Sequence, residues 1–218
     1  MYQSTTKLIG IFLFSCLVLS CQGQTPKTNH TNAATTVGGP FENRDFMFIG
    51  MPKNIKATDT SPGWNQEGQK LLITGTIYKK DRKTPAPDVI VYYYHTDIFG
   101  NYANAENLDA PASKHGYIRG WVQSDAKGKY AIYTVKPASY PNSNITAHIH
   151  PSIKEPHIEI PYYIDAWVFD DDPFLTQSQR NNMRNRGGNG ILKTTTKSNL
   201  LVAKQDIILG LNIPNYPD

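Results

Sequence analysis

A series of short β-type segments, which begins beyond Phe41, limits the possible folds more than any other feature of the chain. The segments are rich in Val, Ile, Thr and Tyr, which favour strands, and clusters of Gly, Pro, Asn or Asp separate them. They cover residues 71 to 78, 88 to 97, 116 to 125, 129 to 135, 145 to 152, 162 to 169 and 199 to 209. Seven or more short strands joined by turns predict an all-β fold, an antiparallel β-sandwich.

Two local signals add detail to this sandwich. The stretch "DAKG" at 125 to 128 predicts a tight hairpin turn, in which Gly128 supplies a permissive backbone. One short helix is predicted near "DDPFLTQSQRNNM", with Asp172 as its N-cap and Pro173 at its first helical position. We therefore expect residues 41 to 218 to form one sandwich domain with irregular loops and a single short helix.

The first twenty residues have the composition of a targeting segment. Lys7 precedes the apolar run "LIGIFLFSCLVLS", and Cys21 follows it, which predicts a secretion signal over residues 1 to 20. The stretch "VLSC" resembles a bacterial lipobox and implies a secreted protein held on a membrane surface of the cell envelope by acyl chains on Cys21. The alternative is a plain signal cut elsewhere, with Cys21 free. Cys16 leaves with the signal, so no disulfide is expected.

Half of residues 21 to 40 are Thr, Asn or Gly, and the segment predicts a flexible tether because it offers almost no large apolar side chain to bury. The chain has 22 basic and 18 acidic residues, and the predicted signal contains one Lys and no acid. The mature chain would thus have 22 − 1 = 21 basic residues against 18 acidic ones, a net charge of +3. This charge is too small to indicate a nucleic-acid partner.

Two histidines and two tyrosines are candidates for metal binding. His148 and His150 alternate along a predicted strand, so both point to one face while Ile149 points to the other. This pattern alone is more typical of a solvent-facing strand than of a metal site. Tyr102 and Tyr140 lie in turns, where a side chain can point inward. Phenolate oxygen and imidazole nitrogen together suit ferric iron better than zinc, and a trivalent cation would deprotonate a phenol whose ordinary pKa is about 10.

Other ring side chains have simpler explanations. Residues 92 to 95, "YYYH", alternate between two faces of a predicted strand, where packing and hydrogen bonding account for them. His115 and His157 lie in loops and have no obvious partner in the sequence. We expect both of these histidines to be exposed to solvent.

Four stretches in sequence carry a resemblance to a known family. The runs "KTPAPDVIVYYYHTDIFGNY", "RGWVQSDAKGKYAIYTVKPASYP", "AHIH" and "YYIDAWVFDDDP" resemble the core of the intradiol ring-cleavage dioxygenases, which include protocatechuate and catechol dioxygenases. The resemblance covers roughly residues 71 to 175. It implies one Fe(III) per chain, bound by Tyr102, Tyr140, His148 and His150. It also implies a catecholic substrate, O₂, a muconate-type product, Tyr140 as a catalytic base, and association of several copies.

One position departs from the pattern of that family. Members commonly carry an arginine two residues before the alanine of "AHIH", and this chain has Ile145 there, followed by Thr146 where proline is usual. Losing one preorganised group of this kind costs about 2.7 to 4 kcal/mol of transition-state stabilisation in other enzymes. Arg119, Arg184 and Arg186 are candidates for a substitute cation beside the substrate. Each of them is equally explained as a surface or loop-anchoring arginine.

A binding module without catalytic activity is the alternative interpretation. The stretches "GTIYKKDRKTPAPDVIVYYY" and "SDAKGKYAIYTV" also resemble transthyretin-like and carboxypeptidase regulatory-like sandwiches. In such a module the two tyrosines and two histidines would lie on scattered faces. The positions of their oxygen and nitrogen atoms therefore discriminate between the two interpretations.

Overall fold

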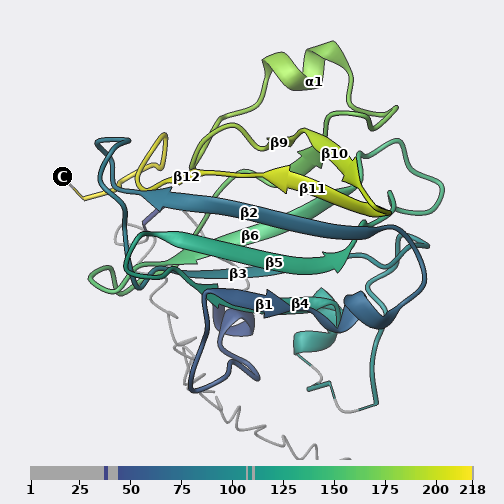
Figure 1. The fold of residues 1–218 in the computed structure, drawn as a ribbon, viewed down its shortest axis with the longest axis horizontal. Coiled ribbons are helices and arrows are strands. Elements are labelled where there is room, and N and C mark those ends of the chain that lie inside the picture. The colour runs from purple at the N-terminus through teal and green to yellow at the C-terminus, as the bar shows by residue number, and fades with distance from the viewer. Residues whose placement is uncertain (1–36, 39–43, 107, 110, 218) are drawn as a thin grey trace, which may run out of the picture. The chain divides into compact units, whose positions relative to one another are not determined.

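Two β-sheets are stacked in the part of the chain that the computed structural model describes, residues 37–38, 44–106, 108–109 and 111–217 (Figure 1). In the first, the β2 sheet, the strand order is β1 (Thr58–Thr60), β5 (Lys129–Val135), β2 (Lys70–Tyr78), β11 (Leu200–Lys204) and β10 (Thr194–Lys197), and β12 (Ile207–Ile208) also pairs with β2. In the second, the β3 sheet, the order is β4 (Arg119–Gln123), β3 (Ile90–His95), β6 (His148–Lys154), β8 (Trp167–Phe169) and β9 (Ile191–Leu192), and β7 (Tyr162–Tyr163) pairs with β6. Each sheet therefore has six strands, which confirms the predicted sandwich.

Several pairs in both sheets are antiparallel, as predicted, but four pairs of the described strands are parallel, and one of these lies in the centre of the β2 sheet. Strand β2 pairs antiparallel with β5, and β3 pairs antiparallel with β4 and β6. Strand β1 pairs parallel with β5, and β9 pairs parallel with β8. Strands β11 and β12 both pair parallel with β2. Parallel neighbours cannot be joined by a tight hairpin, so these strands reach their partners through longer connections.

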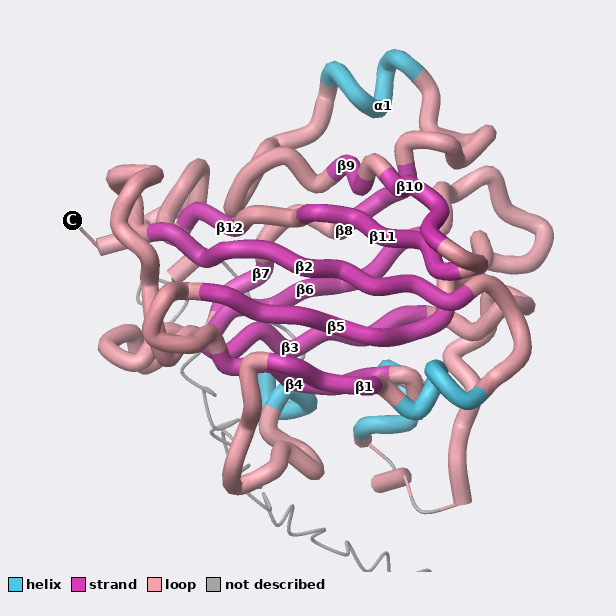
Figure 2. The backbone as a smooth tube through the Cα atoms, in the orientation of Figure 1, coloured by secondary structure: helices cyan, strands magenta, loops and turns pink. Residues whose placement is uncertain are grey.

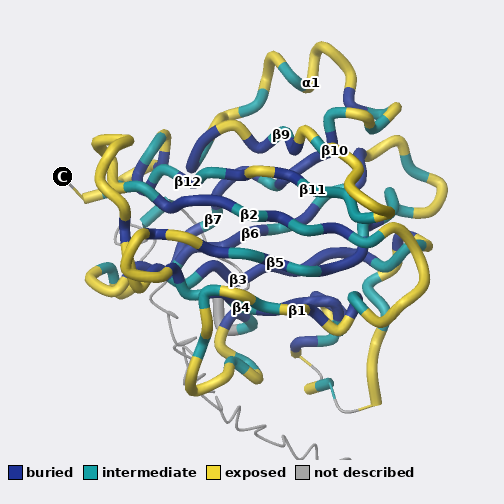
Figure 3. The backbone as a smooth tube through the Cα atoms, in the orientation of Figure 1, coloured by how far each residue is buried: buried dark blue, intermediate teal, exposed yellow. Residues whose placement is uncertain are grey.

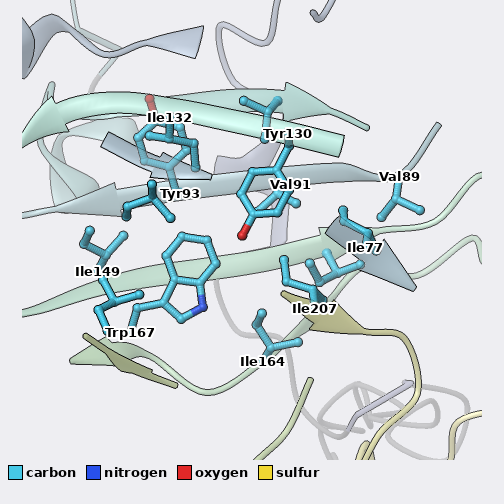
Figure 4. Packing of buried hydrophobic residues seen from close by; sticks show 14 of the residues in the cluster. Ile77, Val89, Val91, Tyr93, Tyr130, Ile132, Ile149, Ile164, Trp167 and Ile207 are labelled. Atoms are coloured by element: carbon cyan, nitrogen blue, oxygen red, sulfur yellow. The ribbon is translucent and has the colours of Figure 1, made fainter. Parts of the chain in front are cut away.

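The core lies between the two sheets, because alternate residues of each strand point inward. Ile73 and Ile132 of the β2 sheet meet Val91, Tyr93 and Trp167 of the β3 sheet, and each of these residues has 0% exposure. Figure 4 shows Ile132, Val91, Tyr93 and Trp167 in this interior layer, and Figure 3 shows the buried parts of the chain in dark blue. Full burial of one large apolar side chain contributes about 1.5 to 3 kcal/mol, so this layer holds the sheets together.

A tight turn is present at 125 to 128, as predicted, but it does not form a hairpin. Strand β4 belongs to the β3 sheet and β5 to the β2 sheet, so the turn takes the chain from one sheet to the other. The carboxylate of Asp125 accepts hydrogen bonds from the backbone nitrogens of Lys127 and Lys129, both at 2.8 Å. Gly128 has φ of 69°, and a Cβ atom there would lie 2.5 Å from the carbonyl oxygen of Ile77. Glycine is required at this position by both its conformation and its close neighbour.

The one α-helix within the described residues begins later than predicted. Helix α1 (Gln177–Asn181) has Thr176 as its N-cap, in a capping box with Gln179. The prediction of Asp172 as the N-cap was wrong, because its carboxylate is used elsewhere. One oxygen accepts from the amide of Phe174 at 2.8 Å and the other from the amide of Ala147 at 2.8 Å. Figure 2 shows α1 apart from the sheets. The other described helical segments are the short 3-10 turns η2 (Arg44–Met47), η3 (Pro62–Asn65) and η4 (Ala112–His115).

The predicted signal over residues 1 to 20 and Cys21 lie outside the described residues, as does the predicted tether apart from residues 37 and 38. In the described part of the predicted tether, the amide of Gly38 donates a hydrogen bond to the carbonyl oxygen of Pro214 at 2.7 Å. Within the described ranges, no helix has the length and apolar character needed to cross a membrane.

Candidate metal centre

Strand β6 places two imidazoles side by side. Residues 148 and 150 share one face of the strand, and Ile149 points into the core with 1% exposure, as the alternation predicted. Strand β6 is bonded to β3 on one side and to β8 on the other, with His150 opposite Tyr94 and His148 opposite Val168. The two histidines therefore stand on backbone that is held from both sides.

Two loops supply the tyrosines. Tyr102 follows β3 in a turn that Asp97 organises, because its carboxylate accepts from the amides of Phe99 and Asn101, both at 2.9 Å. Tyr140 lies in the loop between β5 and β6. Both phenols are half-buried. Residues that are 38 positions apart in the sequence thus come together at the end of β3 and the beginning of β6.

The four polar atoms form a closed ring. The Tyr102 and Tyr140 oxygens lie 2.7 Å apart, and the Tyr140 oxygen lies 3.2 Å from Nε2 of His148. The two histidine Nε2 atoms lie 2.9 Å apart, and Nε2 of His150 lies 3.0 Å from the Tyr102 oxygen. Two donors about 2.0 to 2.2 Å from one ion, and about 90° apart, lie about 2.8 to 3.1 Å from each other. The ring therefore has the size expected of four ligands around one metal ion.

A backbone contact fixes the tautomer of His148. Its Nδ1 lies 2.7 Å from the carbonyl oxygen of Thr146, and a carbonyl can only accept a hydrogen bond. Nδ1 consequently carries the proton, and Nε2 directs a lone pair at the ring of donors. Metal-binding histidines are commonly held in this way by a hydrogen bond from the second nitrogen.

Burial controls the charge of these groups. Burial lowers the pKa of His148, and it lowers the pKa of His150 to about 3 with help from the neighbouring histidines. Both imidazoles are therefore neutral near pH 7. Burial, and then the hydrogen bond with Tyr140, raises the pKa of Tyr102, so this group is a phenol in the absence of a cation. A trivalent cation acts in the opposite direction and favours the phenolate.

The donor set fits ferric iron. Among the described residues, no group of three or more His, Cys, Asp or Glu side chains could hold a metal ion, so a four-donor set here depends on the two phenols. Phenolate oxygen is a hard donor and neutral imidazole a borderline one, which together suit Fe(III). The residues that would hold this ion are those predicted from the sequence, Tyr102, Tyr140, His148 and His150.

A stack of rings supports His150 from behind. The ring of His150 stacks on Tyr94 with centroids 4.6 Å apart, and Tyr94 stacks on His115 with centroids 3.7 Å apart. His115 is 3% exposed, so the prediction that it faces solvent was wrong, whereas His157 is exposed as predicted. The sequence around His115 does not indicate that this residue is buried, because its ring partners come from strand β3, which is distant in the sequence.

The three candidate arginines have different surroundings. Arg119 is buried and anchors the N-terminal segment by donating to the carbonyl oxygens of Phe46 and Ile49, at 3.2 and 2.8 Å. Arg184 is exposed, and Arg186 is half-buried. Ile145, at the family's arginine position, is 50% exposed.

Arg186 alone of the three lines a pocket with His150, and Nε of Arg186 donates to the carboxylate of Asp165 at 2.9 Å. The sequence reasoning missed Asp165. A charged residue within the apolar segment 162 to 169 was the available signal, because such a residue needs a buried partner.

The sandwich and its ring of two phenols and two imidazoles correspond to a class of ring-cleaving dioxygenases, and comparison with protein families agrees. Residues 45–186 match the family model Dioxygenase_C, described as "Dioxygenase". The match covers more than half of the chain, and the chain belongs to the intradiol ring-cleavage dioxygenase family.

Two relatives have low sequence identity to this chain. The protocatechuate 3,4-dioxygenase beta chain of Burkholderia cepacia is 27% identical over 118 residues, which cover 50% of this chain and 48% of that protein. Catechol 1,2-dioxygenase of Acinetobacter baylyi is 24% identical over 164 residues, which cover 65% of this chain and 50% of that protein. The chain thus spans about half the length of these two relatives.

Solved structures share the fold at lower identity. The dioxygenase domain of a dioxygenase and carbohydrate-binding protein fusion from Streptomyces sp. SirexAA-E superposes with a TM-score of 0.56 and 17% identity, covering 73% of this chain and 91% of that one. The 3-chlorocatechol 1,2-dioxygenase of Rhodococcus opacus 1CP gives a TM-score of 0.53 and 16% identity, covering 82% of this chain and 73% of that one. At these identities the likeness concerns the fold.

Proposed function

We propose that this chain binds one Fe(III) through Tyr102, Tyr140, His148 and His150 and cleaves a catecholic ring with O₂ to a muconate-type diacid. The closed ring of four donor atoms, 2.7 to 3.2 Å apart, is the observation that supports this function most directly. A bound ferric ion would supply a Lewis acid that binds the catechol oxygens and makes the ring reactive toward O₂.

The charges of the four side chains suit an anionic substrate. The two neutral imidazoles add no charge, and two tyrosinates would add two negative charges. A trivalent ion would retain one unit of positive charge toward a catecholate. Catechol must lose its hydroxyl protons to bind in this form, so a base is required beside the metal.

We propose Tyr140 as that base. It lies in a loop, and its contact with His148 is the longest in the ring of donors, at 3.2 Å. A phenolate held from a loop can withdraw and accept one of the two protons of the incoming catechol with little change elsewhere in the site, and hydroxide would accept the other. Tyr102, His148 and His150 would remain in place and hold the site together.

The first test is the colour of the protein. Ferric tyrosinate absorbs visible light by charge transfer, so the iron-loaded protein is expected to be coloured, with one iron per chain. Tyr140→Phe should shift or weaken that band. Tyr133→Phe is the control, because Tyr133 packs on Trp64, away from the ring of donors. A colourless, iron-free wild-type protein would rule out the proposed metal centre.

The second test is oxygen uptake with catechol, 3,4-dihydroxybenzoate and hydroxyquinol. Uptake with formation of a diacid is the expected result. Because Ile145 replaces the family's arginine, we expect slower turnover than an arginine-containing site would give. A coloured iron protein that consumes no O₂ with any catechol would separate metal binding from catalysis and remove the catalytic proposal.

The non-catalytic module is disfavoured by the same geometry. That alternative needs the two tyrosines and two histidines on scattered faces, whereas their polar atoms meet within hydrogen-bonding distance. An iron-free protein would restore this alternative.

We further propose a secreted protein, lipid-anchored at the cell envelope through Cys21, on the strength of the sequence "VLSC". Incorporation of a labelled fatty acid that Cys21→Ala abolishes, with release of the protein from membranes, is the expected outcome. Incorporation that persists in the variant would exclude this anchor. Self-association stays a prediction, which analytical ultracentrifugation would test.

A further inference from the structure

A pocket of about 290 Å³ adjoins the candidate metal centre, and His150 forms part of its wall. The other residues that line it are Tyr94, Pro151, Tyr163, Ile164, Ala166 and Arg186. Small-molecule sites commonly have volumes of about 300 to 1,000 Å³, so this pocket has room for a single substituted ring. A substrate bound beside His150 would lie against these groups.

Arg186 brings a positive charge into this pocket. Among the described residues that line it, Arg186 is the only Arg, Lys, Asp or Glu. The guanidinium group has five N–H donors in a planar fork. Nε donates to Asp165, and no described residue accepts a hydrogen bond from the two terminal nitrogens.

Asp165 fixes the direction of that arginine. Its carboxylate accepts from Nε of Arg186 at 2.9 Å, and its amide donates to the Arg186 carbonyl oxygen at 3.0 Å. The Asp165 side chain is 10% exposed, so this ion pair is shielded from solvent. The pair uses one edge of the guanidinium group and leaves the terminal edge for a further partner.

The backbone after Arg186 is held against the wall of the pocket. Gly187 has φ of 76°, its amide donates to Leu211 at 2.9 Å, and its carbonyl oxygen accepts from Ile208 at 2.8 Å. A Cβ atom at this glycine would lie 2.6 Å from the side chain of Ile164, which itself lines the pocket. The arginine is therefore a fixed part of the pocket.

We propose that the terminal nitrogens of Arg186, oriented by Asp165, bind a carboxylate group on the catechol ring, so that this site prefers carboxylated catechols to unsubstituted catechol. This inference rests on the proposed function, because the ring itself would be bound at the metal centre. A planar carboxylate matches the two terminal nitrogens of the guanidinium fork, which remain available because the pair with Asp165 uses Nε. Arg186 is thereby a specificity-determining residue.

The test compares three catechols that differ at one substituent. Anaerobic titration of the ferric protein with 3,4-dihydroxybenzoate, 3,4-dihydroxybenzamide and catechol gives a Kd for each from the change in the charge-transfer band. We expect the wild type to bind the benzoate about 10- to 100-fold more tightly than the benzamide, the range for a hydrogen bond to a charged group. Arg186→Met should remove that preference and leave the Kd of catechol within about twofold.

Two variants control for general effects. Arg184→Met removes the same charge from an exposed position on the same segment and should leave all three Kd values unchanged. Arg186→Lys keeps the charge without the planar fork and should retain part of the preference. Equal weakening of all three ligands in Arg186→Met would show that Arg186 acts on the common ring, and unchanged Kd values would show no role. Either result overturns the inference.

A second measurement separates this inference from the proposed function. Benzoate lacks the two hydroxyl groups that chelate a metal, so its binding to the metal-free protein can be followed by NMR titration. We expect saturable binding that involves residues of the pocket, that benzamide does not reproduce, and that Arg186→Met abolishes. Absence of the charge-transfer band in the wild type would reject the metal centre, whereas absence of benzoate binding would reject the role of Arg186.

Discussion

The backbone of Gly100 lies directly against the carbonyl oxygen of Ser139, so that a Cβ atom at Gly100 would lie 2.0 Å from that oxygen. Gly100 also has φ of 79°, a conformation that glycine adopts easily and other residues adopt at a cost. Gly100 precedes Tyr102 by two positions, and Ser139 directly precedes Tyr140. This contact therefore sets the approach of the two loops whose phenol oxygens lie 2.7 Å apart.

Gly100→Ala is predicted to separate the two tyrosine loops although it touches neither phenol. The added methyl group cannot be accommodated without movement of one loop, because its closest neighbour is backbone. We expect iron affinity to fall more than about tenfold, as for the loss of groups that support metal ligands. Iron content and the charge-transfer band measure this effect.

Gly128→Ala is the matched control, since Gly128 also has positive φ and also lies close to a backbone oxygen, 2.5 Å for the added atom. It should destabilise the protein while the band keeps its position. If the two variants had equal effects on the band, the contact between Gly100 and Ser139 would have no special role in the site.

His150→Ala should release the metal. It removes one of the four donors and also the ring that stacks on Tyr94. Removal of a metal ligand should lower metal affinity at least as much as removal of a residue that hydrogen-bonds to a ligand. We therefore expect iron affinity to fall by more than about 100-fold. His157→Ala removes an exposed histidine and should leave one iron per chain. Metal analysis after dialysis distinguishes the two, and retention of iron by His150→Ala would remove this residue from the ligand set.

The stability of the metal-free protein should depend on pH through His95. Its Nδ1 donates to the Thr96 carbonyl oxygen at 2.7 Å, and its Nε2 accepts from the Thr134 hydroxyl at 2.8 Å. Full burial lowers the pKa of His95 to about 4, from about 6.5 in the unfolded chain. Below pH 6.5 the unfolded chain binds a proton that the folded one rejects. Stability is therefore complete above pH 6.5 and falls as the pH drops toward 4, by about 1.4 kcal/mol per pH unit.

Urea denaturation at pH 7 and pH 5 measures this effect. His95→Gln cannot titrate, so its loss of stability between the two pH values should be smaller than that of the wild type by about 2 kcal/mol. Part of the pH dependence should remain, because burial also lowers the pKa of His115 to about 4. An identical loss in the variant and the wild type would show that His95 is not the group responsible.

Ile149→Ala should destabilise the fold without removing a donor. Ile149 lies between the two candidate histidine ligands in the sequence but points into the core, where it is 1% exposed. Truncation of a buried isoleucine costs about 2 to 5 kcal/mol of folding free energy. Ile145→Ala, at a position that is 50% exposed, should change stability by no more than about 0.5 kcal/mol. Equal unfolding free energies for the two variants would contradict the position assigned to Ile149.

Strands with several buried residues could be predicted from the sequence, and very short or exposed edge strands could not. Residues 129 to 135 alternate between buried and less buried positions, and the structure gives these same bounds for β5. Strand β10 has the sequence TTTK and no buried residue, so it lacks the apolar period that reveals a strand. Strands β1 and β9, of three and two residues, are too short to show a period.

The candidate ligands were predictable for two different reasons. Alternation along one strand placed His148 and His150 on a common face, which is a local property of the chain. The choice of Tyr102 and Tyr140 depended on the resemblance to a family, because loop positions have no period. Asp165 could be recognised from the sequence as a buried charge, but its pairing with Arg186 depends on a contact across the fold.

The support of the four donors is divided between a strand and two loops. The peptide repeat of β6 sets the separation of the two nitrogen donors, and its bonds to β3 and β8 preserve that separation whatever the loops do. The reach of the oxygen donors depends on the length and course of the segments after β3 and before β6. Insertions or deletions in those segments would move the oxygen donors alone. Loop length is thus the variable through which this architecture can change the distance between its oxygen and nitrogen donors.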